Sequence, residues 1–438
     1  MDQLSSMVGF LENKTILVTG ATGFLAKVFV EKILRIQPHI KLFLLLKAKD
    51  SASALKRLHG EILSTDLFRV LRERSCSDLN YLISERVIVP IAGDVLCEDM
   101  GVNDLQLKNE MWNEVDIVVN MAATVKFDER YDIALAINTM GPIHTLNFAN
   151  KCANLKVFIH VSTAYVCGER EGVVDEMPFK MGETLNGRFD LDINLEFKIM
   201  EENLNNLKER KLDEPAITAA MKDFGLKRAR SFGWPNTYVF TKAMGEMLIG
   251  ESRGNMPLVI LRPTIVSSTI EEPFPGWIEG VRTVDSVAIA YGKGRIKCFI
   301  GDLNSILDLI PADMVASSII VAISAHADKP GVTIYHLGSS SKNPLKLSSI
   351  VQWCYMYFSQ HPLIGMDGKT VMVRKFKLLN TMKAFHKYLS LHYIIPLKML
   401  KLANIVSFHY FESFYSNAKR KIYIATRMVE LLQILRVL

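Results

Sequence analysis

The sequence predicts an α/β fold, a doubly wound parallel sheet followed by a mainly helical C-terminal region. Three observations predict it: continuous apolar runs, helical patterns between them, and a glycine-rich turn after the first run. Continuous apolar runs indicate strands buried on both faces, as in a parallel sheet covered by helices. After the first strand we expect a helix from Phe24 to Gln37. The expected strands are KTILVT (14–19), KLFLLLK (41–47), RVIVPIAGD (86–94), VDIVVNMAA (115–123), VFIHVSTAYV (157–166), PLVILRP (257–263) and TIYHLG (333–338).

The segment TGATGFLA places Gly20 and Gly23 between the first strand and the first helix, the context that a dinucleotide-binding turn requires. Gly20 permits the tight turn, and Gly23 lets the backbone approach a pyrophosphate at the helix N-terminus. Ala26, at the third glycine position, is small enough for close helix packing. The sequence therefore predicts a Rossmann-type nucleotide site, with a glycine turn that binds no ligand as the alternative.

The end of the second strand indicates which dinucleotide binds. An acidic residue there accepts hydrogen bonds from the ribose hydroxyls and favours NAD, whereas this strand ends in Lys47, followed by Lys49. Positive charge accommodates a 2′-phosphate, so the sequence favours NADPH. The alternative is that both lysines are ordinary surface residues.

Two further motifs follow strands at the edge of the sheet where ligands bind. Asp94 and Val95 follow the third strand, and Asn120, Ala122 and Ala123 close the fourth. Asp94 can accept a hydrogen bond from the adenine amine, and the two alanines leave room for the cofactor. Structural turns have similar sequences, so both interpretations remain open here.

The segment YVFTK places Tyr238 and Lys242 one helical turn apart on the same face. An ammonium at this spacing is expected to lower the pKa of the phenol from about 10, so that Tyr238 donates a proton to a carbonyl oxygen as hydride arrives. An ordinary helix-surface pair has the same spacing. The segment HVSTAYV favours the catalytic interpretation, because its hydroxyls can share a developing oxyanion; Thr163 is the first choice and Ser162 the second.

These motifs resemble those of extended short-chain dehydrogenases/reductases: TGATGFLA, GDV, NMAA, NTMG, STAYV, YVFTK and LRPTIV. Within that group, three longer segments are similar to plant fatty acyl-CoA reductases, the family that includes male-sterility proteins. The resemblance covers nearly the whole chain. The three segments are KTILVTGATGFLAKVFVEKIL, VNMAATVKFDERYDIALAINTMGP and FIHVSTAYVCGEREG.

The resemblance implies an alcohol-forming enzyme, which reduces a long-chain acyl-CoA to a primary fatty alcohol with two NADPH, through an aldehyde, and releases CoA. Tyr238 would be the proton donor, Lys242 would bind the nicotinamide ribose, Thr163 or Ser162 would stabilise the carbonyl oxygen, and Asn138 would support a proton relay. The expected cofactor contacts are Thr19, Gly20, Thr22, Gly23, Phe24, Leu25, Lys47, Lys49, Asp94, Val95, Asn120, Ala122, Ala123, Asn138, Tyr238, Lys242 and Pro263.

The sequence differs from these relatives in two respects. Lys47 stands where they usually have arginine, which weakens bidentate phosphate recognition but keeps the charge. A further stretch of some tens of residues beyond VELLQILRVL is expected to be missing, so a catalytically impaired paralogue is one alternative. The other is a different extended reductase or an epimerase.

We expect two domains. Residues 1–345 would form the NADPH-binding domain, with substrate insertions at about 169–233 and 270–330, and residues 346–438 a helical, basic region. The acyl chain is expected to contact these insertions and the aromatic C-terminal region. From Met366 to Arg427 there are twelve Lys/Arg and two Asp/Glu, a net charge of +10 in a chain of net charge +6. This segment suits an anionic membrane surface or ligand phosphates, with a solvated helical face as the alternative.

Composition limits compartment and partners. With 49% hydrophobic and 22% charged residues the chain is a folded globular protein, and its six scattered cysteines predict no disulfide, no metal and a reducing compartment. The N-terminus leaves no room for a cleavable targeting peptide. The apolar stretch 388–408 contains Pro396, Lys398 and Lys401 and is therefore expected to be buried or interfacial. The resemblance to plant fatty acyl-CoA reductases implies acyl-CoA as a partner and the cytosolic face of the endoplasmic reticulum membrane as the location, with the cytoplasm as the alternative location. No nucleic acid is expected as a partner.

Overall fold

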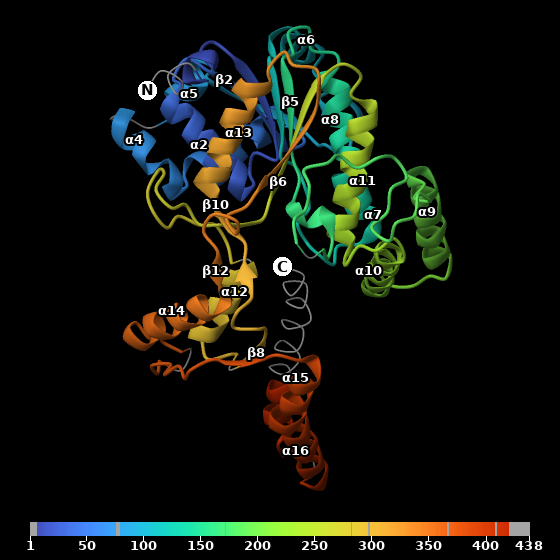
Figure 1. The fold of residues 1–438 in the computed structure, drawn as a ribbon, viewed down its shortest axis with the longest axis vertical. Coiled ribbons are helices and arrows are strands. Elements are labelled where there is room, and N and C mark those ends of the chain that lie inside the picture. Colours follow the sequence, from blue (N-terminus) through green and yellow to red (C-terminus); the bar gives the residue numbers. More distant parts are fainter. Residues whose placement is uncertain are drawn as a thin grey trace. The chain divides into compact units, whose positions relative to one another are not determined.

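The protein folds into two compact units, each described by itself (Figure 1). The first comprises Met1–Glu279 and Ile310–Gly338, and the second comprises Gly280–Leu309 and Ser339–Leu438. The division therefore differs from the expected boundary at residue 345, because residues 280–309 belong to the second unit. The computed structural model describes residues 7–75, 79–170, 172–281, 283–296, 298–365, 368–407 and 410–419.

A parallel sheet of seven strands organises the first unit and confirms the expected fold class. The strand order is β11-β6-β5-β4-β1-β2-β3, so the direction of winding reverses between β1 and β4. All seven expected strands belong to this sheet. They are β1 (Thr15–Thr19), β2 (Lys41–Lys47), β3 (Ile88–Gly93), β4 (Ile117–Asn120), β5 (Val157–Val161), β6 (Pro257–Pro263) and β11 (Gly331–Leu337).

Helices cover both faces of this sheet, which is why its strands are apolar on both sides (Figure 1). In β1, Ile16 and Val18 pack under α2 and α13, whereas Leu17 packs on the opposite side under α6, α8 and α11. The same alternation continues through the neighbouring strands. The covering helices are α2 (Phe24–Ile36), α13 (Ala312–His326), α6 (Leu105–Glu114), α8 (Gly141–Ala149) and α11 (Thr237–Ser252).

The segment expected as an insertion after β5 contains two helices, α9 (Ile193–Glu209) and α10 (Glu214–Ser231). Asp192 and Asp213 cap their N-termini, and both helices share a third apolar core with α11. The remaining elements of this unit are short. They are α3 (Ser51–Arg57), η1 (Leu58–Leu63), η2 (Asp66–Phe68), α4 (Arg69–Ser75), α5 (Tyr81–Ser84), η3 (Glu98–Gly101), α7 (Tyr131–Ala134), η4 (Leu135–Met140), η5 (Ala164–Cys167), β7 (Ile265–Ser267) and β10 (Leu309–Pro311), which leads the chain back into this unit.

The second unit is mainly helical, with two small sheets. Its β8 pairs with β13 in parallel, and its β9 pairs with β12 in antiparallel. The stretch Lys383–Val406 is long and apolar enough to cross a membrane by length and composition alone. In its apolar 18-residue window 11% of the residues are buried, so of the two expectations, buried or interfacial, the buried one is not supported. The elements are α12 (Thr283–Gly292), β8 (Cys298–Ile300), β9 (Ile306–Leu307), β12 (Leu345–Lys346), α14 (Leu347–Gln360), β13 (Lys377–Leu379), α15 (Met382–Leu389), η6 (Ser390–Ile394) and α16 (Ile395–Val406). Of the basic segment, Met366, Asp367, Arg420, Lys421 and Arg427 lie outside the described residues.

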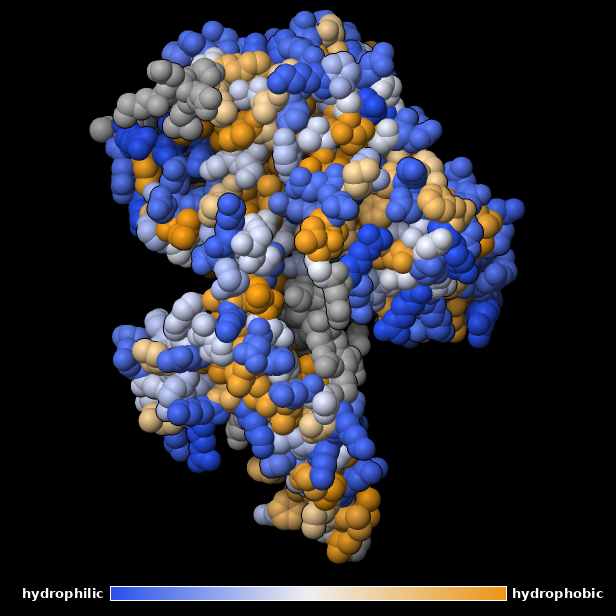
Figure 2. Space-filling model, viewed as in Figure 1, coloured by the Kyte–Doolittle hydropathy of each residue, from blue (hydrophilic) through white to orange (hydrophobic). Residues whose placement is uncertain are grey.

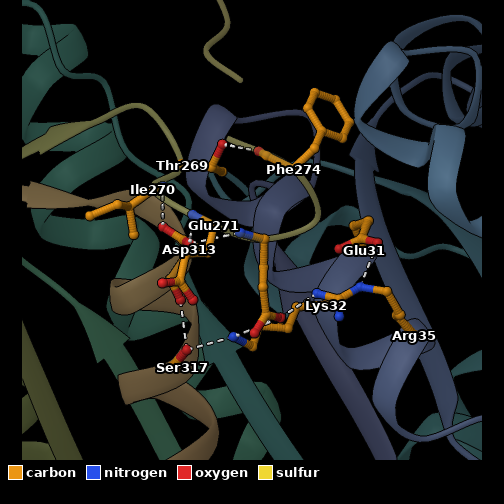
Figure 3. Close-up of polar contacts among 10 residues, drawn as sticks. Glu31, Lys32, Arg35, Thr269, Ile270, Glu271, Phe274, Asp313 and Ser317 are labelled. Atoms are coloured by element: carbon orange, nitrogen blue, oxygen red, sulfur yellow. Dashed lines mark hydrogen bonds and ion pairs between the residues drawn. The ribbon is translucent and has the colours of Figure 1, made fainter. Parts of the chain in front are cut away.

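The loop after β7, expected to contact the acyl chain, is fastened to the helices of the first unit. Asp313 accepts hydrogen bonds from three successive backbone N–H groups, those of Ile270, Glu271 and Glu272, each at 3.0 Å (Figure 3). At its far end, Trp277 stacks on Phe24 with ring centroids 5.4 Å apart. The loop thereby fixes the first turn of α2 against the N-terminus of α13.

Charged residues of α2 hold the same loop. Glu272 forms ion pairs with Lys32 and Arg35, and Glu279 with the buried Lys27. Figure 3 shows Lys32 also reaching the hydroxyl of Ser317 on α13, at 2.7 Å. The loop is therefore part of the frame around the glycine turn.

We expect Asp313→Asn to lower the free energy of unfolding by about 1–3 kcal/mol. The asparagine amide has one acceptor oxygen where the carboxylate has two, and it lacks the negative charge that strengthens the three hydrogen bonds to the loop. Chemical denaturation followed by tryptophan fluorescence measures the change. The control is Asp328→Asn, whose carboxylate is largely exposed and whose ion pair with Lys156 is 3.5 Å long. Equal stability of the two variants would contradict the proposed role of Asp313.

Candidate functional site

The glycine turn lies where the winding of the sheet reverses, the position at which such sheets bind dinucleotides. Gly20 has a positive φ of 68°, and a Cβ atom there would lie 2.7 Å from the backbone nitrogen of Ala122. Gly23 is the N-cap of α2, and its extended backbone directs the chain into the helix. Only glycine fits at position 20, where the turn packs against the backbone that follows β4, and the N-terminus of α2 is the place where a pyrophosphate would bind.

A chain of buried side chains connects this turn to α11. The Thr19 hydroxyl lies 2.6 Å from Asn120 Oδ1, and Asn120 Nδ2 lies 3.1 Å from His160 Nδ1. His160 Nε2 is 3.3 Å from Lys242 Nζ, which also donates to the carbonyl oxygen of Val161 at 2.9 Å. Thr19, Asn120, His160 and Lys242 are each at most 1% exposed. The side chains of β1, β4, β5 and α11 are thus hydrogen-bonded in series.

The direction of these hydrogen bonds follows from Thr19. Its oxygen accepts the backbone N–H groups of Met121 and Ala122, both at 3.2 Å, so both lone pairs are used and its own hydrogen goes to Asn120 Oδ1. Asn120 must then present its NH₂ group to His160 Nδ1, which accepts. The proton of a neutral imidazole therefore sits on Nε2 and faces the amine of Lys242.

The electrostatics agree with this assignment. Burial, and then the positive charge of Lys242, hold the pKa of His160 well below its ordinary value, so the ring is neutral. Burial lowers the pKa of Lys242 to about 8, with Glu246 acting in the opposite direction. An N–H group facing the amine disfavours its protonated form. Lys242 therefore changes its charge within the working pH range.

Tyr238 and Thr163 come together as expected, but the pKa of the phenol shifts in the other direction. Burial raises the pKa of Tyr238 to about 12, although a hydrogen bond with Thr163 lowers it. The expected lowering by Lys242 is wrong for this structure, because the amine points to His160 and the Val161 carbonyl. The phenol is protonated at neutral pH and can donate its proton. The buried hydroxyl of Ser162 has no hydrogen-bond partner among the described residues.

Helix α11 owes its position to two buried contacts. Asn236 caps it by accepting the N–H of Val239 at 3.1 Å, which fixes where the Tyr238 turn begins. One turn beyond Lys242, Glu246 forms an ion pair with Arg262 of β6 at 2.6 Å, and both side chains are 1% exposed. Arg262 in turn contacts His336 at 3.2 Å. His160, Glu246 and Arg262 were not predicted from the sequence. For His160 and Arg262, the available signal was a polar residue inside an otherwise apolar strand.

Asn138, expected to support a proton relay, contacts α11 through Thr241. It bonds the backbone of Thr124 through both ends of its amide, and its Nδ2 donates to Thr241 Oγ1 at 3.1 Å. Its contact with the helix is at Thr241, between Tyr238 and Lys242, and its side-chain hydrogen bonds to described residues go to Thr124 and Thr241. Asn138 therefore fastens α11 to η4.

The expected 2′-phosphate contacts gather at the ends of β2 and β3. Lys47 Nζ forms an ion pair with Asp94 Oδ2 at 2.8 Å, and the Lys47 side chain is 70% exposed. Arg57 donates to the carbonyl oxygen of Lys47. Lys49 lies two residues beyond this strand end.

The remaining expected contacts lie along the edge of the sheet. Pro263 ends β6, and its carbonyl oxygen is 3.5 Å from Thr163 Oγ1. Val95 follows β3, and Ala123 follows β4. Thr22 lies in the glycine turn, and Phe24 and Leu25 begin α2. Within the part of the chain that the structure describes, no cluster of His, Cys, Asp and Glu suits a metal ion.

Comparison with known proteins identifies the family. The NAD-binding family described as male sterility protein matches residues 18–319. Fatty acyl-CoA reductase 1 of Arabidopsis thaliana is 53% identical, over 98% of this chain and 87% of that protein. The alcohol-forming fatty acyl-CoA reductase of Simmondsia chinensis is 49% identical, over 98% of this chain and 88% of that protein.

Solved structures agree with the fold. The reductase domain of a nonribosomal peptide synthetase from Mycobacterium tuberculosis superposes with a TM-score of 0.55 at 20% identity, covering 89% of this chain and 78% of that one. At this identity the likeness concerns the fold alone. Sequence identity near one half over almost the whole chain carries the family assignment: the protein belongs to the fatty acyl-CoA reductases of the male sterility family.

Proposed function

We propose that this protein reduces long-chain acyl-CoA to a primary fatty alcohol with two molecules of NADPH. The observation that carries the proposal is the hydrogen-bonded pair Tyr238 and Thr163, held beside Lys242 at the edge of the sheet that also carries the glycine turn. The names of the relatives that match over nearly the whole chain support the same substrate and product.

The glycine turn fits a dinucleotide, because Gly20 lets the turn pack directly against the backbone of Ala122, and Gly23 leaves the N-terminus of α2 without a side chain in front of it. When bound, the nicotinamide supplies the hydride. Thr163 and Tyr238 hold the substrate carbonyl oxygen by their hydroxyl groups and stabilise the negative charge that develops on it. Lys242 orients the cofactor ribose through its ammonium.

Two reductions follow at the same hydroxyl groups. The first converts the thioester carbon to a hemithioacetal, whose collapse breaks the C–S bond and releases CoA with an aldehyde. The second reduces the aldehyde, and Tyr238 donates its proton to the oxygen to give the alcohol. In total, one acyl-CoA, two hydrides and two protons yield one alcohol and one CoA thiol.

NADPH is the proposed cofactor because basic side chains lie at the end of β2, where Lys47 is paired with Asp94 and Arg57 with Glu61. Lys47, Lys49 and Arg57 gather there, and a 2′-phosphate would compete with Asp94 for Lys47. Activity measured with NADPH and with NADH at equal concentration tests this choice, and we expect NADPH to be preferred.

The second unit offers a place for the acyl chain. A cavity of about 320 Å³ lies between α12, α14 and the β8–β13 pair, and its walls are mainly apolar. Val287, Ile350 and Leu378 are among the lining side chains. Burial of a hydrocarbon chain there is favourable, because apolar surface leaves water. We propose this cavity of the C-terminal region as a binding site for an apolar hydrocarbon chain.

We expect Tyr238→Phe to lower kcat about 10²- to 10⁴-fold, because the variant keeps the ring but lacks the proton. Yeast cells that express the protein are analysed for fatty alcohols, and purified protein is assayed with palmitoyl-CoA. Tyr335→Phe, a half-buried tyrosine of β11, is the control. Full alcohol formation by Tyr238→Phe would contradict the assignment.

The pH dependence of kcat/KM should report the protonation state of Lys242. Its pKa is lowered to about 8, so the required ammonium is present below pH 8 and is lost as the pH rises; kcat/KM should fall about tenfold per pH unit above it. We expect Asn120→Asp to move this fall to higher pH. The new carboxylate accepts a hydrogen bond from Nδ1–H of His160, so the proton of the ring moves from Nε2 to Nδ1. Nε2 then accepts a hydrogen bond from the ammonium of Lys242, which raises the pKa of Lys242.

The matched control for this prediction is Asn154→Asp, the same substitution at an exposed position. A pH profile of Asn120→Asp that coincides with that of the unchanged protein, while NADPH binding persists, would refute the assigned hydrogen-bond direction.

We propose that the protein contacts the cytosolic face of the endoplasmic reticulum membrane through α16. Met399, Leu402 and Val406 share one face of this helix and are 65–75% exposed, and Lys398 and Lys401 adjoin them. Figure 2 shows apolar side chains gathered over the end of the second unit that carries this helix. An amphipathic basic helix of this kind suits an anionic lipid surface.

In flotation with vesicles of phosphatidylcholine and phosphatidylserine, we expect Met399→Glu combined with Leu402→Glu to reduce the bound fraction roughly tenfold or more, because two apolar side chains no longer leave water. The control is Val173→Glu, at an exposed position of the first unit. Equal flotation of both proteins would contradict a membrane role for α16.

A further inference from the structure

A second cavity, polar in character, opens in the first unit, where the segment that follows Thr163 meets the segment that precedes Tyr238. It measures about 320 Å³ and lies between the end of η5, the end of α10 and the segment that leads into α11. Cys167, Glu169, Arg170, Arg230 and Trp234 are among its lining residues. Polar surface predominates, so the cavity suits a charged ligand better than an acyl chain.

Two arginines give this cavity its charge. Arg170 and Arg230 are exposed, and within the described part of the chain neither side chain forms an ion pair or a hydrogen bond. Neighbouring arginines are paired: Arg228 binds Glu196, and Arg188 binds Asp190. With Glu169 as the acidic residue of the lining, the cavity carries a net charge of +1. Unpaired guanidinium groups offer two parallel N–H donors each, which is the geometry of phosphate recognition.

The cavity is connected to the reaction centre by short, rigid links. Thr163 is the N-cap of η5, and Cys167 ends the same 3₁₀ helix. On the opposite wall, Trp234 donates its indole N–H to the carbonyl oxygen of Val166 at 2.8 Å, and Tyr238 follows one turn later in the chain. A ligand whose carbonyl rests on Thr163 and Tyr238 therefore has this positive cavity beside it.

The position also separates this cavity from the phosphates of NADPH. Those are expected at the glycine turn after β1 and at Lys47 after β2, whereas the cavity follows β5 on the other side of the reversal between β1 and β4. A phosphate there belongs to a second ligand. Multiply charged phosphates remain near water, and exposed arginines at a cavity mouth meet that requirement.

We propose that Arg170 and Arg230 bind the phosphates of coenzyme A, so that its nucleotide end is held in this cavity while the thioester reaches Tyr238. The inference rests on the proposed function, since it concerns the substrate of that reaction. Pantetheine carries no phosphate, and dephospho-CoA lacks the 3′-phosphate but keeps the pyrophosphate. Comparison of CoA, dephospho-CoA and pantetheine therefore separates the contribution of the 3′-phosphate to the binding affinity from that of the pyrophosphate.

The test is calorimetric titration of the full chain with CoA, dephospho-CoA and pantetheine. We expect Arg170→Gln and Arg230→Gln each to weaken CoA binding about tenfold, while pantetheine binding is unchanged. Glu169→Gln should tighten CoA binding, because it removes the one negative charge of the lining. Lys227→Gln, a solvent-exposed cation of α10 paired with Asp223, is the control and should change nothing.

Kinetics provide the second readout. The KM for palmitoyl-CoA should rise in the arginine variants toward that for palmitoyl-pantetheine, whose own KM stays constant, and added salt should reduce this difference. Variants that bind CoA as the unchanged protein does, or that weaken CoA and pantetheine equally, would overturn the inference. Failure of the proposed function has a different signature: CoA binds with the expected arginine dependence, yet neither thioester yields alcohol.

Discussion

The row of hydrogen bonds from Thr19 through Asn120 and His160 to Lys242 is the constraint on which the rest of the site depends. It joins three strands and a helix by side chains that are removed from water, where an unpaired polar group is costly. Any shift of one strand along its neighbour would break it. The glycine turn and the Tyr238 helix are therefore held at a fixed separation.

Two further contacts stiffen the same region from outside. The Glu246–Arg262 ion pair anchors α11 to β6, and the loop beginning at Thr269 presses Trp277 onto the start of α2. An enzyme that stabilises a developing charge benefits from groups that need not reorganise during the reaction. The proposed catalysis would depend on the same buried bonds as the stability of the fold, because these bonds are part of the core.

Local pattern was sufficient for the sheet and for the residues along its edge. Strand length, turn glycines and the spacing of Tyr238 and Lys242 are short-range features, and they led to the fold class and to the residues that the structure brings together. Contacts distant in sequence were not available from pattern. His160 meets Lys242 across 82 positions, so neither the ring's tautomer nor the shift of the phenol's pKa to about 12 followed from the YVFTK spacing. The assignment of residues 280–309 to the second unit was not predicted for the same reason, because their strands pair with strands that lie tens of residues later in the chain.

The second unit is assembled from two separate stretches of chain, and this limits how it can be exchanged. Its β8 and β9 come from residues 280–309, whereas their partners β13 and β12 come from beyond residue 339. A chimera that grafts only the C-terminal stretch of a relative would join strands from two different proteins in both small sheets. Recombination that conserves this unit must therefore transfer both stretches together.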